Sequence, residues 1–101
     1  MLFRSVTIGH RAIVHSAQVG DGALIGMGAT LLNRSRIGAR CLVGAGALVT
    51  ENKIFDEGKM ILGAPARVLR DLSAEELSGL KQSAAIYVAN GARYRERLRE
   101  I

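Results

Sequence analysis

The chain of 101 residues lacks most of what builds a bulky or a disulfide-linked core. It has no Trp, 4% aromatic residues and a single Pro, so its core must be built from Val, Ile, Leu and Ala. Its one cysteine, Cys41, has no partner for an internal disulfide, and no N-terminal apolar run has the length of a signal peptide or a membrane span. These absences predict a single cytoplasmic domain without a membrane partner.

The positive charge does not indicate a nucleic-acid-binding protein. The formal net charge is +5, and the arginines are densest near the C-terminus, in a run of alternate residues from Arg93 to Arg99. Tyr94 is the one aromatic residue within the run, which is too few for a series of stacking platforms, and no nucleic-acid-binding motif is present. The run is typical of the solvated side of a helix, so we expect no nucleic acid partner.

The sequence does contain a six-residue repeat. A glycine follows most of the repeated aliphatic residues, and a small residue stands four positions after them. The aliphatic residues are Val19, Ile25, Leu31, Ile37, Val43 and Val49. Six is a multiple of the strand period of two, so they all face one side, whereas a helix of 3.6 residues per turn would spread them around its axis. The repeat excludes a helix for residues 6–50 and predicts a solenoid of short parallel strands.

Two details of the repeat predict local geometry. The glycines that follow the aliphatic residues, such as Gly20 and Gly38, are expected to allow tight bends, at positions where a side chain would clash or would resist positive φ. Upstream, the step from Val14 to Val19 is five residues and not six, so one side of the first coil should be a residue short. Both histidines of the chain lie in this first coil.

The repeat is expected to end after Val49, in a polar loop over residues 51–58. A short apolar run and a Gly-Ala-Pro turn follow. From Ser73 the pattern is helical, because Ser73 and Glu76 predict a capping box and apolar residues then step by three and four to Ile101. The predicted divisions are residues 1–5, which do not continue the pattern, 6–71 as coils and closing loop, and 72–101 as a C-terminal α-helix.

Three stretches carry a resemblance to a known family. The hexads match the hexapeptide-repeat pattern, and the segments 7–15 and 43–49 together with the turn 63–66 resemble the gamma-class carbonic anhydrase family. The resemblance implies an all-β solenoid plus helix, namely a left-handed parallel β-helix of hexapeptide repeats with a C-terminal α-helix. The left hand comes from the resemblance and not from the spacing. It also implies an N-terminally truncated member, a fragment of a longer parent.

The same resemblance implies a metal site. In that family three histidines hold zinc, or iron in some relatives, at the interfaces of a homotrimer, and two of them match His10 and His15. The third lies upstream, and residues 1–5 contain no histidine. Residues five apart in a strand point to opposite faces, so one chain cannot easily chelate with both. The resemblance implies that His10 of one subunit and His15 of its neighbour share an ion, whose bound hydroxide reversibly hydrates CO₂ to bicarbonate in the parent. No catalytic residue is assigned, and the sequence leaves open whether this chain is itself an enzyme.

Two other functions stay open at the level of the sequence. One is a hexapeptide-repeat acyltransferase or an acyl-CoA-linked relative, in which a histidine serves as general base toward a hydroxyl. The other is a non-catalytic trimeric scaffold with a vestigial metal site. The closely spaced histidines argue against the acyltransferase. Cys41 stands at a repeat position otherwise held by Ala or Ser, so we interpret it as a small buried residue and not as a nucleophile. The first coil is expected to expose Ile8 and Ile13 unless Leu2 and Phe3 cover it.

Overall fold

A computed structural model describes residues 6–81 of the chain. Nine strands of two residues are followed by two longer ones, and a helix begins at residue 74. The strands are β1 (Thr7–Ile8), β2 (Ile13–Val14), β3 (Gln18–Val19), β4 (Leu24–Ile25), β5 (Thr30–Leu31), β6 (Arg36–Ile37), β7 (Leu42–Val43), β8 (Leu48–Val49), β9 (Ile54–Phe55), β10 (Lys59–Gly63) and β11 (Ala66–Asp71).

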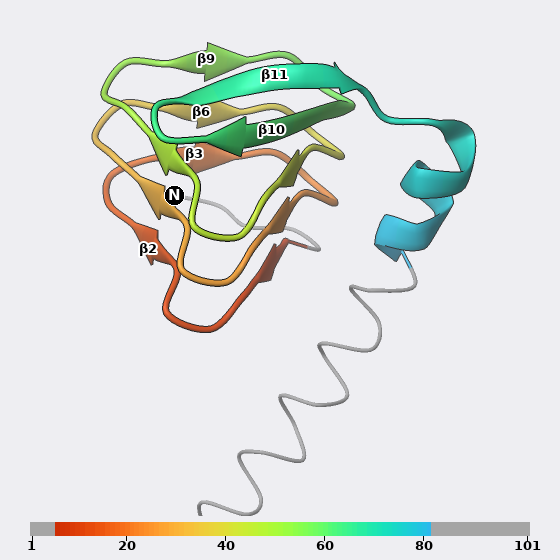
Figure 1. Ribbon diagram of the computed structural model, residues 1–101, viewed down its shortest axis with the longest axis horizontal. Helices are drawn as coiled ribbons and strands as arrows, with labels where there is room; N and C mark the ends of the chain where they lie inside the picture. Colours follow the sequence, from red (N-terminus) through yellow and green to blue (C-terminus); the bar gives the residue numbers. More distant parts are fainter. Residues whose placement is uncertain (1–5, 82–101) are drawn as a thin grey trace, which may run out of the picture.

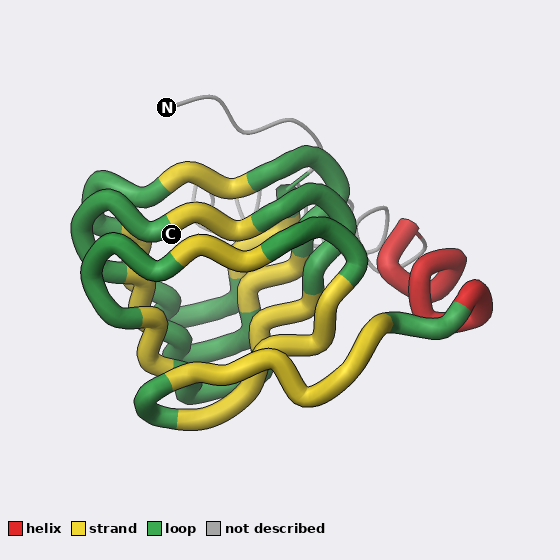
Figure 2. The backbone as a smooth tube through the Cα atoms, turned by 90° about the horizontal axis from the view of Figure 1, so that it is seen from above, coloured by secondary structure: helices red, strands yellow, loops and turns green. Residues whose placement is uncertain are grey.

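Every third strand pairs in parallel, so the chain winds as a three-sided solenoid of about three turns (Figures 1 and 2). Face A carries β1, β4, β7, β10 and β11, face B carries β2, β5 and β8, and face C carries β3, β6 and β9. This is the predicted parallel β-helix of hexapeptide repeats. In Figure 1 it rises from the red first coil to the green β9, and β10 and β11 form an antiparallel hairpin at that end.

The register confirms the predicted short side of the first coil. On face A, Leu24 pairs with Leu42, eighteen residues further on, but Thr7 pairs with Leu24, only seventeen further on. On face C the first step is again eighteen, from Gln18 to Arg36. The missing residue therefore lies in the corner between β2 and β3.

The solenoid runs further than the sequence predicted. The expected polar loop at residues 51–58 is wrong, because β9 pairs with β6 and β10 pairs with β7. Phe55 and Ile61 continue the six-residue step after Val49 and are buried like the aliphatic residues before them. An aromatic residue that is followed by Asp56 and not by glycine concealed the repeat at Phe55. The coils end instead where β10 turns back into β11.

The role predicted for the glycines after the aliphatic residues is confirmed for the clash of a side chain but is wrong for the bends. The bends lie two residues later, where φ is positive with or without glycine, at Arg11, Gly22, Gly28, Arg34, Arg40, Gly46, Asn52 and Gly58. Gly20 and Gly38 are needed because the next coil lies against them. A Cβ at Gly20 would lie 2.4 Å from the backbone N of Ala39, and one at Gly38 would lie 2.5 Å from that of Glu57. Glycine thus sets the spacing of the coils.

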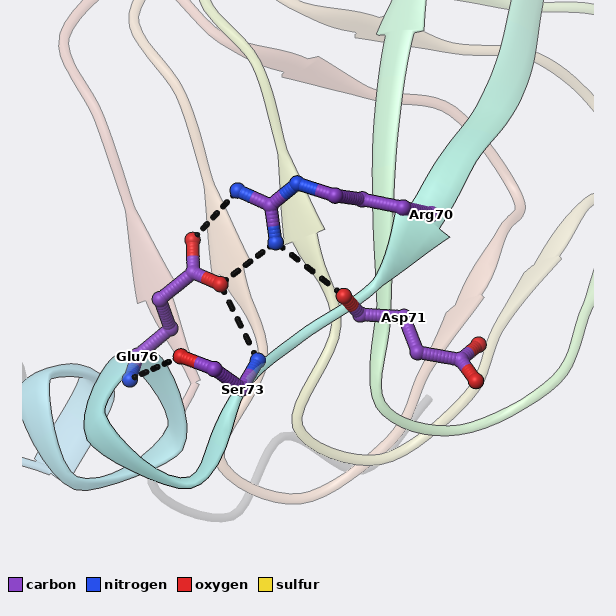
Figure 3. Close-up of polar contacts among 4 residues, drawn as sticks. All are labelled: Arg70, Asp71, Ser73 and Glu76. Carbon is purple, nitrogen blue, oxygen red and sulfur yellow. Dashed lines mark hydrogen bonds and ion pairs between the residues drawn. The ribbon is translucent and has the colours of Figure 1, made fainter.

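The predicted capping box is present at the start of the helix (Figure 3). The backbone N–H of Ser73 donates to Oε1 of Glu76 at 3.0 Å, and that of Glu76 donates to Oγ of Ser73 at 3.1 Å. Arg70 at the end of β11 donates to both carboxylate oxygens of Glu76, at 2.5 and 2.8 Å. The ion pair ties the helix to the hairpin, and the helix lies to one side of the coils (Figures 1 and 2).

Most of the predicted apolar stripe of the helix lies outside the described residues, as do residues 1–5. Within the described part, Leu80 is buried and Leu77 is partly buried. No helix within residues 6–81 combines the length and the apolar character that a bilayer crossing requires.

Replacing a coil-spacing glycine should destabilise the solenoid. A Cβ at Gly38 would meet the backbone of the next coil, which cannot move without breaking its ladder, so Gly38→Ala should lower the free energy of unfolding by about 1–3 kcal/mol. The control is Gly79→Ala in the helix, where a Cβ meets no atom within 4 Å and the change should stabilise by about 0.5–1 kcal/mol. Urea unfolding of both variants checks the pair, and equal effects would refute the packing argument.

The capping box should make helix stability depend on pH. The hydrogen bond from Arg70, followed by that from the backbone N–H of Ser73, lowers the pKa of Glu76 from 4.5 to about 2. The stabilisation is therefore complete above about pH 4.5 and is lost as the pH falls through about 2. At pH 7, Glu76→Gln should have weaker helical circular dichroism than the parent chain, and the difference should vanish near pH 2. A constant difference over this range would contradict the assignment.

Candidate metal centre

The two candidate ligands lie on the first coil, at opposite ends of β2. His10 is in the corner between faces A and B, and His15 is in the corner between faces B and C. Their backbones are held by the second coil, since the carbonyl of His10 accepts from Gly28 N and the N–H of His15 donates to Leu31 O, both at 2.9 Å. Both side chains are exposed. The imidazoles are therefore anchored through their backbones and project from the outside of the solenoid.

The two corners differ in length. His10 belongs to an ordinary corner, in which Arg11 has a φ of 59°. His15 opens the short corner, where Ser16 has a φ of 50° and its carbonyl accepts from Arg34 N at 2.9 Å. The residue missing from the first coil is thus missing beside one of the two candidate ligands.

The face between the two histidines is uncharged and partly apolar. The outward side chains of face B are those of Ile13, Thr30 and Leu48. Ile13 is 56% exposed, although it is a large aliphatic residue, and Met27, one coil beyond His10 on the same corner, is exposed as well. The predicted exposure of Ile13 is confirmed, but its cause is its outward register on face B.

One chain does not bring a complete set of ligands together. Among residues 6–81, no group of three or more His, Cys, Asp or Glu side chains could hold a metal ion. His10 and His15 lie on separate corners, as the spacing predicted. Neutral imidazoles are good zinc ligands, but a catalytic zinc takes three protein ligands. The described chain alone therefore does not form such a site, but each of its two histidines could serve as one ligand of a site that is completed by other residues.

A polar cluster on the corner of His15 was not visible in the sequence. One coil further along, Nε of Arg34 donates to Oδ1 of Asn52 at 2.7 Å, and its Nη2 lies 3.8 Å from Oε2 of Glu51. Beside them the buried Oδ1 of Asn33 accepts no hydrogen bond within the part of the chain that the structure describes. These residues are neighbours only because the coils stack in an eighteen-residue register, and this register is established by the strand pairing.

The interpretation of Cys41 as a small buried residue is confirmed. Its side chain is fully buried, and its Sγ donates to the carbonyl of Asp56 at 3.0 Å. Burial raises the pKa of the Cys41 thiol. A buried, protonated thiol is a poor nucleophile and a poor metal ligand.

A groove of about 660 Å³ lies on face C. Its wall includes the outward side chains of Gln18, Arg36 and Ile54, and the bare backbone of Gly20 and Gly38. The groove follows three coils and does not include either histidine, so the described chain does not combine it with the candidate metal ligands.

Comparison with known proteins identifies the repeat and its relatives. Residues 16–51 match the family described as bacterial transferase hexapeptide (six repeats). The chain is 46% identical over 83 residues to gamma carbonic anhydrase 1, mitochondrial, of Arabidopsis thaliana, which covers 82% of this chain and 30% of that protein. It is 40% identical over 90 residues to a carbonic anhydrase of Geobacillus kaustophilus, covering 89% of this chain and 50% of the relative.

A solved structure shows the same fold. The crystal structure of a hexapeptide transferase family protein from Anaplasma phagocytophilum superimposes with a TM-score of 0.83 at 37% sequence identity, covering 89% of this chain and 54% of that one. The chain thus spans about half the length, or less, of the proteins that it matches.

The burial of Cys41 has a measurable consequence. Because the thiol is enclosed and protonated, an aromatic disulfide reagent should not react with it while the solenoid is intact. In denaturant the same thiol should react at the rate of a free cysteine. Fast reaction under native conditions, at a rate independent of added urea, would contradict the packing of this corner.

Proposed function

We propose, since this chain is a hexapeptide-repeat protein related to the gamma carbonic anhydrases, that it is part of a homotrimeric metalloprotein that reversibly hydrates CO₂ to bicarbonate. One observation carries the proposal: His10 and His15 are exposed at the two ends of one strand, on a single coil. The relatives named as carbonic anhydrases supply the reaction, and the geometry supplies a way to form its site.

A three-fold assembly joins the two histidines. The solenoid has three faces, so three copies that turn face B toward a common axis meet at their corners. The corner of His10 in one subunit then lies against the corner of His15 in the next. Because both residues belong to the first coil, they meet at the same height along the axis.

The surface between the histidines supports this arrangement. Ile13 and Met27 are large exposed apolar side chains on or beside face B, and an exposed apolar surface is typical of a protein interface. None of the three outward side chains of face B is charged. In the proposed trimer this face becomes buried, and the uncharged wall beside the site suits a small apolar substrate such as CO₂.

His10 of one subunit and His15 of its neighbour would hold zinc, or iron, through neutral imidazole nitrogens. The bound ion would supply the Lewis acidity that lowers the pKa of water to about 7. These are the only two histidines of the chain, so a third histidine ligand would come from a segment outside this sequence. Backbone hydrogen bonds to the second coil fix the backbone position of both residues, from which each imidazole projects.

Mixing two variants tests whether the site is shared. His10→Ala and His15→Ala should each lose bound zinc, because every interface then lacks one imidazole. When the two are unfolded and refolded together in equal amounts, about one interface in four pairs an intact His10 with an intact His15 by random assortment. Zinc content by atomic emission should recover to about this fraction, together with any CO₂ hydration.

The controls separate assembly from binding. Each variant should still form trimers in sedimentation, and refolding either variant alone should recover no zinc. Recovery of zinc by one variant alone, or no recovery by the mixture despite mixed trimers, would refute the shared site.

A second function is favoured by two of the comparisons. The matched family is described as a bacterial transferase family, and the Anaplasma phagocytophilum structure is named as a hexapeptide transferase family protein. In an acyltransferase or an acyl-CoA-linked relative, a histidine would act as general base toward an acceptor hydroxyl. A rise in melting temperature with coenzyme A but not with zinc would favour this function, and a trimer that responds to neither would indicate a scaffold.

A further inference from the structure

Arginine stands at the positive-φ position of three corners of the described chain. Arg11, Arg34 and Arg40 have φ values of 59°, 61° and 55°. A residue with a side chain adopts this conformation rarely, and glycine takes the same position at other corners, as Gly28 and Gly46 do. The backbone is alike at the three arginines, so they differ in what their guanidinium groups contact.

Two of the three guanidinium groups have a partner in the next coil. Nη2 of Arg40 donates to Oε2 of Glu57 at 2.6 Å. Nε of Arg34 donates to Oδ1 of Asn52 at 2.7 Å, and its Nη2 lies 3.8 Å from Oε2 of Glu51. In each case the acidic residue stands seventeen positions after the arginine, from 34 to 51 and from 40 to 57. The positive charge of these two arginines is therefore balanced by the solenoid itself.

Arg11 has no such partner within residues 6–81. Its side chain is exposed, and its guanidinium makes no ion pair or hydrogen bond with this part of the chain. The first coil is a residue short, so the place of the acidic partner falls sixteen positions after Arg11, on the uncharged Met27. Arg11 is also the only charged residue between residues 6 and 20 when the histidines are neutral. An unbalanced guanidinium therefore stands beside His10.

We infer that Arg11 binds the bicarbonate anion at the candidate metal centre. The inference rests on the proposed function, in which bicarbonate is the product formed there. A guanidinium donates two parallel N–H groups to two oxygens of a planar oxyanion, and the opposite charges strengthen both hydrogen bonds. Bicarbonate offers such a pair of oxygens and a negative charge, whereas CO₂ is uncharged. Arg11 therefore adds to the binding of the anion and changes that of CO₂ little.

The place of Arg11 in the first coil supports this role. It directly follows His10 in the corner between faces A and B. In the proposed trimer this corner meets the corner of His15 and Ser16 at the same height, and neither of these residues has an acidic side chain. Glu51 is the acidic residue of that second corner, but it belongs to the third coil, two coils away. The guanidinium of Arg11 thus remains available to a small anion.

Arg11→Gln in the zinc-loaded trimer tests the inference. Zinc content should not change, because a guanidinium has no lone pair to give to a metal. Bicarbonate affinity, measured by NMR from the amide shifts of the first coil, should fall about five- to tenfold with the loss of a charge-assisted pair at the surface. The KM for bicarbonate in dehydration should rise by a similar factor, while the KM for CO₂ stays nearly unchanged. Arg11→Lys keeps the charge but not the paired donors and should recover part of the affinity.

Arg40→Gln is the matched control. It removes a guanidinium that pairs with Glu57 on the corner between faces C and A, and it lowers the net charge by the same amount. It should leave the bicarbonate affinity unchanged. A measurement on the parent chain needs no variant, since the Nε–H signal of Arg11 should shift saturably as bicarbonate is added. Circular dichroism and sedimentation establish that the variants fold and form trimers.

The results separate the inference from the proposed function. If zinc binds and Arg11→Gln keeps the bicarbonate affinity of the parent, or Arg40→Gln weakens it equally, the inference is wrong and the shared metal site stands. If the parent chain binds no zinc, the proposed function is refuted and the inference falls with it. If Arg11→Gln no longer forms trimers while Arg40→Gln does, the guanidinium of Arg11 pairs with a neighbouring copy and not with an anion.

Discussion

The closeness of successive coils is the constraint on which the rest of the structure depends. A Cβ at Gly20, Gly26 or Gly38 would lie 2.4–2.6 Å from a backbone atom of the next coil, so these positions must lack a side chain. The aliphatic residues can then stack at 0–5% exposure in a core only one side chain wide, as Val19, Ile25 and Val43 show. The same stacking holds both histidines at one height, because their backbones hydrogen-bond to a single neighbouring coil.

The short corner is the main departure from this regularity. Removing one residue between Val14 and Val19 leaves both of them facing the core, because the corner still turns from face B to face C. The missing residue alters only the outer surface of the solenoid, at the corner that begins with His15 and continues with Ser16 at positive φ. A solenoid can therefore vary its outward chemistry at a corner while the inward stripe and the strand pairing continue.

Most of the fold could be predicted because its determinants are local. A six-residue step defines strands, and Ser73 with Glu76 defines the helix start, without knowledge of distant contacts. The error at residues 51–58 arose because a position there depends on another coil: Phe55 extends the core only through pairing of β9 with β6. For the candidate site, the sequence indicates His10 and His15 as candidate ligands, but a site shared between subunits needs a partner that no single sequence describes. The cluster of Arg34, Glu51 and Asn52 was missed for a similar reason, since it forms only through the stacking register.

The central claim is that imidazoles of adjoining subunits bind one ion. The most direct measurement is anomalous scattering at the zinc absorption edge, from crystals of the protein grown with zinc. The account predicts one peak per subunit, between His10 of one subunit and His15 of the next, repeated about a three-fold axis that passes along face B. Zinc bound by a single chain, or trimers whose two imidazoles point apart into solvent without a peak between them, would contradict it.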